Sequence, residues 1–391
     1  MVRILHTADW QIGKPYGRVR DPDNRARLRQ ARFDAVRGMA ALVREHRIEL
    51  VLIAGDLFDS PGPTTADVAQ ICSAIGALKV PALVIPGNHD HGAPGSLWHQ
   101  GWFWKLASEL APNLEVLLKP EPILRAGLTV LPCPLLRQVD STDPSAWVRG
   151  LDSSLLSHHP RVLLAHGSVQ GFASDADADE ENPAPSLNRL DLSALPDGLI
   201  DYVALGDWHG LKQVAAHAWY SGCPEQDRFP RGDDYRSGQV LIADVQRGCV
   251  PDVEVISTGQ MRWHQISHRC SSGEDVQALQ RLLARQLAAR SGEDLLLLEL
   301  DGQLNMADTR ALTDLLEGLE ARLLRLKLRN RLRTVADDVE TTDLTRRSSD
   351  PLVARVAAVL QERSTSADDP EQQLLAQMAL QELSNLCAVK H

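Results

Sequence analysis

Short apolar runs alternate with longer amphipathic segments over the first 258 residues of the chain. Five of these runs have the length and composition of buried strands. They cover residues 2–5, 50–54, 80–86, 161–165 and 202–205. The amphipathic segments between them predict helices at 24–46, from Thr64 or Thr65 to 78, and from Ser96 to 110, because a Thr or Ser can cap the start of a helix.

The same region contains weaker elements and a second run of strands. We expect strands at 114–118 and 128–131, the latter closed by Pro132, a helix at 144–157 and a loop at 171–185. After Gly210, strands follow one another directly, at 219–221, 239–245 and 253–256. Strands that first alternate with helices and then run consecutively predict an α/β fold, a two-sheet β-sandwich flanked by helices. We therefore expect residues 1–258 to form one large domain.

The pattern changes near Gly259. Strand-like and helix-like segments alternate again, at 261–268, 274–290, 294–300, 306–324 and 326–335. This βαβαβ order predicts a small α+β domain over 259–335. Residues 336–350 are polar and are expected to form a linker, and 351–391 carry a helical pair at 351–363 and 370–387.

Composition limits the compartment and the partners. The chain has 391 residues and 43% hydrophobic residues, and no apolar run approaches the ~20 residues that span a bilayer. It starts directly with a strand and its six cysteines form no C-x-x-C pair, so we expect a cytoplasmic protein with reduced thiols and no membrane. The net charge of −11 argues against a nucleic-acid partner. A bound metal adds positive charge, however, and part of the acidic excess is concentrated at 175–181.

Each of the five apolar runs ends in residues that can bind a metal ion. The groups that follow them are Asp9-Trp10-Gln11, Gly55-Asp56-Leu57-Phe58-Asp59, Gly87-Asn88-His89-Asp90, His166-Gly167 and Gly206-Asp207-Trp208-His209. Open α/β sheets place their sites at the carboxyl ends of strands. Carboxylate, amide and imidazole donors suit a divalent first-row ion such as Mn²⁺, Fe²⁺ or Zn²⁺. Two such ions, sharing one carboxylate, can clamp a phosphate and polarise a water.

These groups resemble the motifs of the calcineurin-like binuclear metallophosphoesterases, which run D-x-H, G-D-x-x-D, G-N-H-[DE], H and G-H-x-H. Their order and the C-terminal architecture are most similar to the SbcD-type nuclease subunits. The segment Tyr220-Ser221-Gly222-Cys223-Pro224-Glu225 also resembles the Y-x-G-S-x-E turn of that type. The resemblance implies that residues 1–258 are the catalytic domain and that 259–335 form a capping domain of the DNA-recognition kind. The motif resemblance covers residues 1 to about 260, and only the architecture matches beyond it.

The resemblance implies a role for each of these residues. Asp9 and His209 would bind the first ion, Asn88 and His166 the second, and Asp56 would bridge both. His89 would not bind metal but would face the phosphate and protonate or stabilise the leaving oxygen. Asp59 would orient the His89 imidazole, because a carboxylate partner fixes the tautomer.

Two residues depart from the family pattern. Gln11 stands where the family has a first-metal His, and Asp207 where it has a second-metal His. A Gln carbonyl is a weaker ligand than imidazole, so the first site should be looser. The shift from nitrogen to oxygen donors favours Mn²⁺, or Mg²⁺, over Zn²⁺. The neighbouring Trp10 and Trp208 could line the cleft or fill the core.

Three features have two interpretations each. The arginines of 24–46 (25, 27, 29, 32, 37 and 44) usually mark a solvated helix face, but could contact DNA. The aromatic run Trp98, Trp102, Phe103, Trp104 could be core or the seam of a homodimer, as helices in this region are in the family. The C-terminal helices could pack on the chain itself or dock on the coiled coil of an ATPase.

The resemblance implies a Mn²⁺-dependent nuclease that acts on DNA, in repair or end processing, together with an SMC-like coiled-coil ATPase of the SbcC type. One alternative is a phosphoesterase for a small molecule or phosphoprotein, which would need neither the βαβαβ domain nor the helical tail. A second is a non-catalytic scaffold with a degenerate metal site, which Gln11 and Asp207 would favour.

Overall fold

A computed structural model describes residues 1–152, 154, 156–169, 188–230, 235–287, 292–334, 342, 344–365 and 370–388 of the chain. The expected loop at 171–185 lies outside these residues. The chain divides into two compact units, Met1–Met261 and Arg262–His391. No helix in the described part of the chain is long and apolar enough to cross a membrane. All six cysteines carry free thiols.

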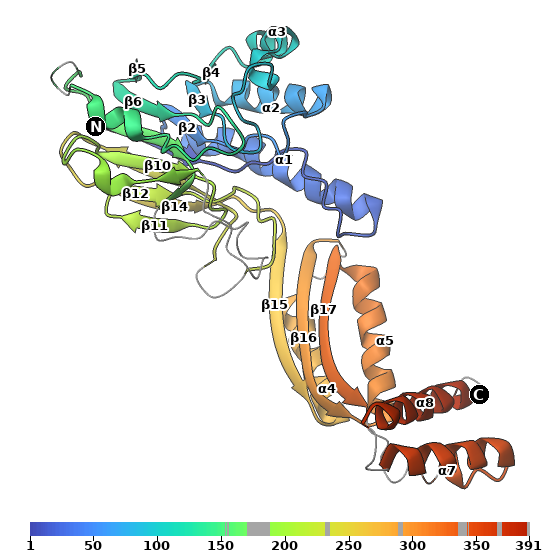
Figure 1. The fold of residues 1–391 in the computed structure, drawn as a ribbon. Helices are drawn as coiled ribbons and strands as arrows, with labels where there is room; N and C mark the ends of the chain where they lie inside the picture. Colours follow the sequence, from blue (N-terminus) through green and yellow to red (C-terminus); the bar gives the residue numbers. More distant parts are fainter. Residues whose placement is uncertain are drawn as a thin grey trace. The chain divides into compact units, whose positions relative to one another are not determined.

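The first unit contains two six-stranded sheets (Figure 1). The first sheet has the spatial order β14 (Asp252–Ser257), β13 (Gln239–Val245), β1 (Val2–Thr7), β2 (Leu50–Ala54), β3 (Ala82–Ile85) and β4 (Leu114–Val116). The second has the order β11 (Lys212–Ala215), β12 (Ala218–Tyr220), β10 (Tyr202–Gly206), β7 (Arg161–His166), β6 (Leu128–Cys133) and β5 (Ile123–Arg125). Both are mixed, with parallel strands at the centre, and β8 (Ser168–Val169) pairs with β9 (Arg189–Leu190) beside them. The predicted two-sheet α/β sandwich is confirmed.

Alternate side chains of the central strands enter different cores. Leu52 of β2 packs toward the second sheet, together with Leu164 of β7 and Ala204 of β10. Its neighbour Ile53 packs on the opposite side, under the helices. Burial on both faces explains why β2 is apolar throughout rather than alternating with polar residues.

Three helices cover the outer face of the first sheet (Figure 1): α1 (Pro22–Glu45), α2 (Thr65–Leu78) and α3 (Gly101–Leu110). Asp21 caps α1 and Thr64 caps α2 by accepting main-chain N–H bonds. The helix expected from Ser96 is divided into a 3₁₀ turn (Leu97–His99) and α3. The Ser96 side chain makes no capping bond, and the extended backbone of Gln100 interrupts the helix.

Two further expectations need correction. β6 continues through Pro132 to Cys133. This is possible because β5 pairs with β6 only as far as Val130, so nothing on that side requires an N–H from Pro132. The described residues of 144–157 include a short 3₁₀ helix, Ala146–Gly150, and no α-helix. Asp143 accepts bonds from the Ser145 N–H and hydroxyl, a local alternative to helical bonding.

In the second unit, β15 (Arg262–Cys270), β16 (Asp294–Leu304) and β17 (Arg325–Thr334) form a parallel sheet. The helices α4 (Gly273–Gln286) and α5 (Met306–Arg322) pack on the same face of it, around Leu298 and Leu279. The even-numbered residues of β17 lie on this face, and its odd-numbered residues lie on the opposite one.

Two helices follow at the C-terminus, α7 (Pro351–Thr365) and α8 (Pro370–Ala388). They pack against each other through Ala357 and Leu380, and Met306 of α5 joins this cluster. Leu344 is also buried in the cluster, although it lies in the stretch expected to be a polar linker. The packing therefore includes part of that stretch.

Candidate metal centre

All the candidate side chains of the sequence lie at one edge of the sandwich. β1, β2 and β3 of the first sheet are parallel to one another, as are β7 and β10 of the second, and the polar groups follow their carboxyl ends. Asp9, Asp56 and His166 are fully buried there, and one ligand atom from each lies within 4.8 Å of the others. The structure thus brings together residues from both sheets.

Glycines allow the two sheets to approach each other at this edge. A Cβ on Gly206 would lie 1.9 Å from the Ala54 oxygen, and one on Gly55 would lie 2.2 Å from His166 Nδ1. A Cβ on Gly87 would lie 2.1 Å from Asp56 Oδ1. Any side chain at these positions would displace the groups that form the centre.

The backbone is strained at four of the candidate residues. Asp9, Gln11, Asp56 and Asp207 all have positive φ angles, between 41° and 105°. This conformation costs of order 1–3 kcal/mol for a residue that is not glycine and is found mainly at functional sites. Main-chain bonds hold it: the Asp9 N–H donates to the Gly55 oxygen and the Gln11 N–H to the Asp56 oxygen.

His166 is oriented so that one ring nitrogen faces the carboxylates. Its Nδ1 donates to the Ala54 oxygen at 2.8 Å. Its Nε2 lies 3.1 Å from Asn88 Oδ1, 3.6 Å from Asp56 Oδ1 and 3.9 Å from Asp207 Oδ1. A main-chain acceptor on one nitrogen is the usual way of fixing the tautomer of a metal-binding histidine.

The charges around His166 perturb one another. Burial raises the pKa of Asp9 to about 6, and burial also raises the pKa of Asp207. Burial lowers the pKa of His166, but the carboxylates of Asp56, Asp9 and Asp207 outweigh that effect and raise it to about 9. The cluster therefore favours positive charge at its centre, as expected of a cation site.

Gln11 and His209 lie on the other side of Asp9. Gln11 Nε2 is 3.1 Å from His209 Nε2, and His209 Nδ1 donates to Asp227 Oδ2 at 2.9 Å. Lys14 Nζ donates to Gln11 Oε1 at 2.5 Å and pairs with Asp227 Oδ2 at 3.0 Å. Neither Lys14 nor Asp227 was expected at the site, because no motif spacing links them to it.

His89 lies beside Asp56, and its hydrogen-bond partner differs from the expectation. Its imidazole Nδ1 donates to the main-chain oxygen of Asp59 at 2.8 Å, not to the carboxylate. The Asp59 carboxylate instead faces Lys14 Nζ, at 3.8 Å. His89 Nε2 is left 3.9 Å from Asp56 Oδ2, and 40% of the His89 side chain is exposed. The loop, rather than the acid group, orients this ring.

Sequence reasoning also missed two supporting residues. The buried Asp90 accepts the N–H groups of Gly87 and Phe58, so it ties the loop after β3 to the loop after β2. Burial raises its pKa to about 7. Arg32 of α1, expected on a solvated face, is buried and bonds to Tyr16 Oη and the Trp10 oxygen.

The two tryptophans beside the departures have different surroundings. Trp10 is fully buried and its indole N–H donates to Thr7 Oγ1, so it fills the core. Trp208 is partly exposed and packs edge-on against Tyr235, at 6.0 Å between ring centroids. Of the two, Trp208 is the one that could line a cleft.

The donors around His166 fit a divalent metal ion. They are buried carboxylates, an amide oxygen and an imidazole nitrogen that faces them, and groups of these types are the ligands of Mn²⁺ and similar ions. A second group, His209, Cys223 and Asp227, is also compact, but its Asp227 carboxylate is already neutralised by Lys14 and Arg228. The first group is therefore the better candidate.

Comparison with known proteins agrees with this chemistry. The family model for calcineurin-like phosphoesterases matches residues 2–211. The SbcD component of nuclease SbcCD from Bacillus subtilis (strain 168) is 34% identical over 278 residues, which cover 63% of this chain and 67% of that protein. The solved structure of TT1561 of Thermus thermophilus aligns with 66% of this chain and 99% of that one, at 12% identity and a TM-score of 0.39. That score is too low to add to the assignment. The family model spans more than half of the chain and includes all five polar groups that follow the apolar runs, so the chain belongs to the calcineurin-like phosphoesterases and is a metal-dependent phosphoesterase.

Proposed function

We propose that this protein is a Mn²⁺-dependent DNA nuclease of the SbcD type, which works with an SMC-like coiled-coil ATPase. The observation that carries the phosphodiesterase part is the convergence of Asp9, Asp56 and His166 in one buried cluster. The identity to a nuclease component over two thirds of its length supports the nuclease part. Exposed basic and apolar side chains, described below, support DNA as the substrate and the ATPase and a second copy of the chain as partners.

The residues have the following proposed roles. Asp56 would bridge two metal positions. Asn88, His166 and Asp207 would complete one of them, and Asp9, Gln11 and His209 would hold the other. The two divalent ions, when bound, supply an activated water and neutralise the charge that develops on the phosphate. The excess of oxygen donors favours Mn²⁺, with Mg²⁺ as the second choice.

His89 has a separate role. Because Nδ1 is occupied by the Asp59 oxygen, Nε2 is the atom that can hold a proton and deliver it to the leaving oxygen. Its exposure leaves it accessible to a substrate. Asp59 orients the His89 ring through its main-chain oxygen, while the Asp59 carboxylate pairs with Lys14.

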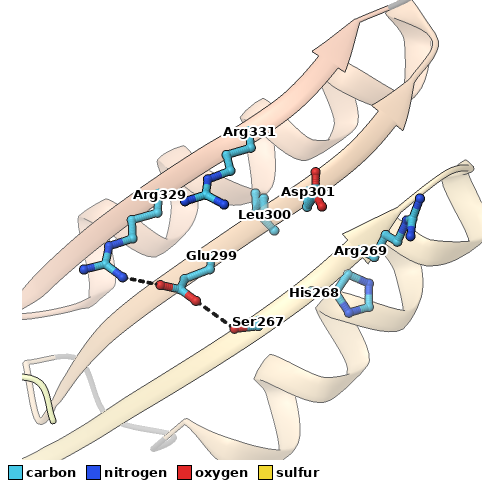
Figure 2. A pocket seen from close by; sticks show the side chains of 8 residues that line it. All are labelled: Ser267, His268, Arg269, Glu299, Leu300, Asp301, Arg329 and Arg331. Atoms are coloured by element: carbon cyan, nitrogen blue, oxygen red, sulfur yellow. Dashed lines mark hydrogen bonds and ion pairs between the residues drawn. The ribbon is translucent and has the colours of Figure 1, made fainter. Parts of the chain in front are cut away.

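A basic sheet face supports DNA as the substrate. The odd-numbered residues of β17 are all basic: Arg325, Lys327, Arg329, Arg331 and Arg333. They lie on the face opposite α4 and α5. Figure 2 shows the hollow on this face, where Arg269 of β15 and Arg331 lie among the lining side chains and Arg329 pairs with Glu299. Such a row of cations suits a phosphate backbone and reads no sequence.

Exposed apolar side chains support the two protein partners. Leu374, Leu375 and Met378 of α8 remain exposed although α8 packs on α7. An exposed apolar stripe on a helix is suited to a partner coiled coil. In the aromatic run, Trp98 and Phe103 are core, whereas Trp102 and Trp104 are exposed and could form a homodimer seam.

The two alternatives are less well supported. A phosphoesterase for small molecules would have no use for the basic face of β17. A non-catalytic scaffold would not need four strained donor positions, which cost stability unless they serve a site. A direct assay distinguishes all three.

The test is cleavage of labelled single- and double-stranded DNA, beside a chromogenic phosphodiester, with Mn²⁺ added to metal-free protein. We expect Mn²⁺-dependent cleavage of DNA, and Asp56→Ala should abolish it. Cleavage of the small ester alone would favour the small-molecule alternative. No cleavage of either, with ions bound, would favour the scaffold.

Paired variants test the basic face. Arg331→Ser with Arg333→Ser should weaken DNA binding by about ten-fold or more and flatten its salt dependence, because two phosphate contacts are lost. Arg27→Ser with Arg29→Ser on α1 removes the same charge from another exposed surface. An equal loss in both pairs would mean that the face of β17 has no special role.

A further inference from the structure

The Gln11 amide is bonded at both ends. Its Oε1 accepts from Lys14 Nζ at 2.5 Å, and its Nε2 lies 3.1 Å from His209 Nε2. Gln11 is 1% exposed and its φ is 41°. The surrounding atoms therefore restrict both its side-chain rotamer and its backbone conformation. Gln11 is also one of the two residues that depart from the motif pattern, which has a histidine at this position.

Lys14 determines which way this amide points. A lysine ammonium only donates, so the oxygen of the amide must face it and the NH₂ must face His209. His209 Nδ1 donates to Asp227, so in the neutral imidazole, the form that binds a metal ion, Nε2 is the nitrogen that carries the lone pair. The Gln11 NH₂ donates to that lone pair, which is the one that a metal ion would need.

Lys14 is itself held in place. Its ammonium lies 3.0 Å from Asp227 Oδ2 and 3.8 Å from Asp59 Oδ1. Asp227 is fully buried, and its charge also lies near Arg228 and Arg32. Because Asp227 also accepts from His209, these side chains form a closed ring of hydrogen bonds and ion pairs, in the order Asp227, Lys14, Gln11, His209.

We propose that Lys14 is a latch on the first metal position. By turning the Gln11 amide, it keeps the carbonyl away from an ion and caps the lone pair of His209. An ion binds there only when the bond between Lys14 and Gln11 breaks. At the second position, around Asn88 and His166, the Ser168 hydroxyl donates to Asp207 Oδ2 at 3.0 Å, but no lysine ammonium pairs with a ligand atom among the described residues. The protein then holds one ion tightly and a second one weakly.

This inference rests on the proposed metal site but not on its activity. The test is a calorimetric titration of the metal-free full chain with Mn²⁺, with bound metal counted by mass spectrometry after equilibrium dialysis. The wild type should bind one ion tightly and a second at least about ten-fold more weakly, as expected from the loss of a charged hydrogen bond. Lys14→Met and Lys14→Gln should each strengthen the weak site by about ten-fold.

A double-variant comparison separates the latch from simple charge. In a Gln11→His background there is no amide for Lys14 to turn, so adding Lys14→Met should leave the weak site nearly unchanged. An equal gain in both backgrounds would mean that only the loss of a positive charge matters, and would overturn the proposal. Lys105→Met, on the exposed surface of α3, is the control for charge, and thermal unfolding checks that each variant is folded.

The outcomes also distinguish this inference from the proposed function. If the wild type has two unequal Mn²⁺ affinities that become equal in Lys14→Met, and the protein cleaves no DNA, the latch is supported and the nuclease is refuted. DNA cleavage by a wild type with two equally strong sites would support the nuclease and refute the latch.

Discussion

At the scale of single residues, the centre depends on positions where only one residue type is tolerated. Gly87 has no side chain because Asp56 Oδ1 occupies the space where one would be. Asp56 in turn accepts the His89 N–H through the same Oδ1, at 2.9 Å. The proposed bridging carboxylate and the proposed proton donor are thus placed by one contact, although their side chains have separate roles.

His89→Ala tests that separation. We expect DNA cleavage to fall by about 10²-fold or more, because the group that protonates the leaving oxygen is removed. Bound Mn²⁺ should not change, because the His89 N–H that Asp56 uses belongs to the main chain. Single-turnover kinetics and metal counting measure the two effects.

The control for this variant is His158→Ala, at an exposed position outside the motifs, which should alter neither quantity. Loss of metal from His89→Ala would identify His89 as a ligand and contradict the assignment.

At the scale of elements, one helix has two apolar faces with different surroundings. Leu380 of α8 is 2% exposed, and it packs with Ala357 and Met306. Leu374 and Leu375, a turn and a half before it, are 58% and 59% exposed. The chain buries one face of α8 by itself and leaves the other uncovered within the described residues.

The exposed face should be needed for the partner and not for folding. We expect Leu375→Glu with Met378→Glu to end co-purification with the coiled-coil ATPase. The free energy of unfolding should change by no more than about 0.5 kcal/mol, as for other surface substitutions. Pull-down and thermal unfolding measure the two.

Leu380→Ala is the matched variant on the buried face and should cost about 2–5 kcal/mol of stability. A large stability loss in the double variant, with partner binding intact, would show that the stripe packs on the chain itself.

At the scale of the whole molecule, the places where charged and apolar side chains are exposed say more about binding partners than the net charge or the total apolar content does. The chain carries a net charge of −11, yet one face of β17 carries a row of five cations. Apolar exposure is equally uneven in α3, where Trp102 is 40% exposed beside the buried Phe103. A tryptophan left in solvent is the kind of residue that anchors a protein interface.

Trp102→Glu should therefore convert a homodimer to a monomer, because it places a charge at the centre of the proposed seam. Light scattering coupled to size-exclusion chromatography measures the mass directly. Val255→Glu on β14, also an exposed apolar position, should leave the mass unchanged. A monomeric wild type would contradict the homodimer.

The strands, the main helices and the residues of the centre could be predicted from the sequence, because each depends on a local pattern. Buried strands are short apolar runs, and Asp9, Asp56, Asn88, His166 and His209 follow the ends of such runs directly. Weaker elements failed where a local bond competed, as Asp143 does with the expected helix at 144–157.

The environment of those residues depended on tertiary contacts. Asp227 bonds to His209, but no spacing rule relates the two, because a loop brings them together. Asp59 was expected to use its carboxylate, yet the turn after β2 presents its main-chain oxygen to His89. Lys14 belongs to no motif, and only the folded chain places it on Gln11. A sequence shows which side chains are present at the edge of a sheet, whereas the fold determines which of their atoms meet.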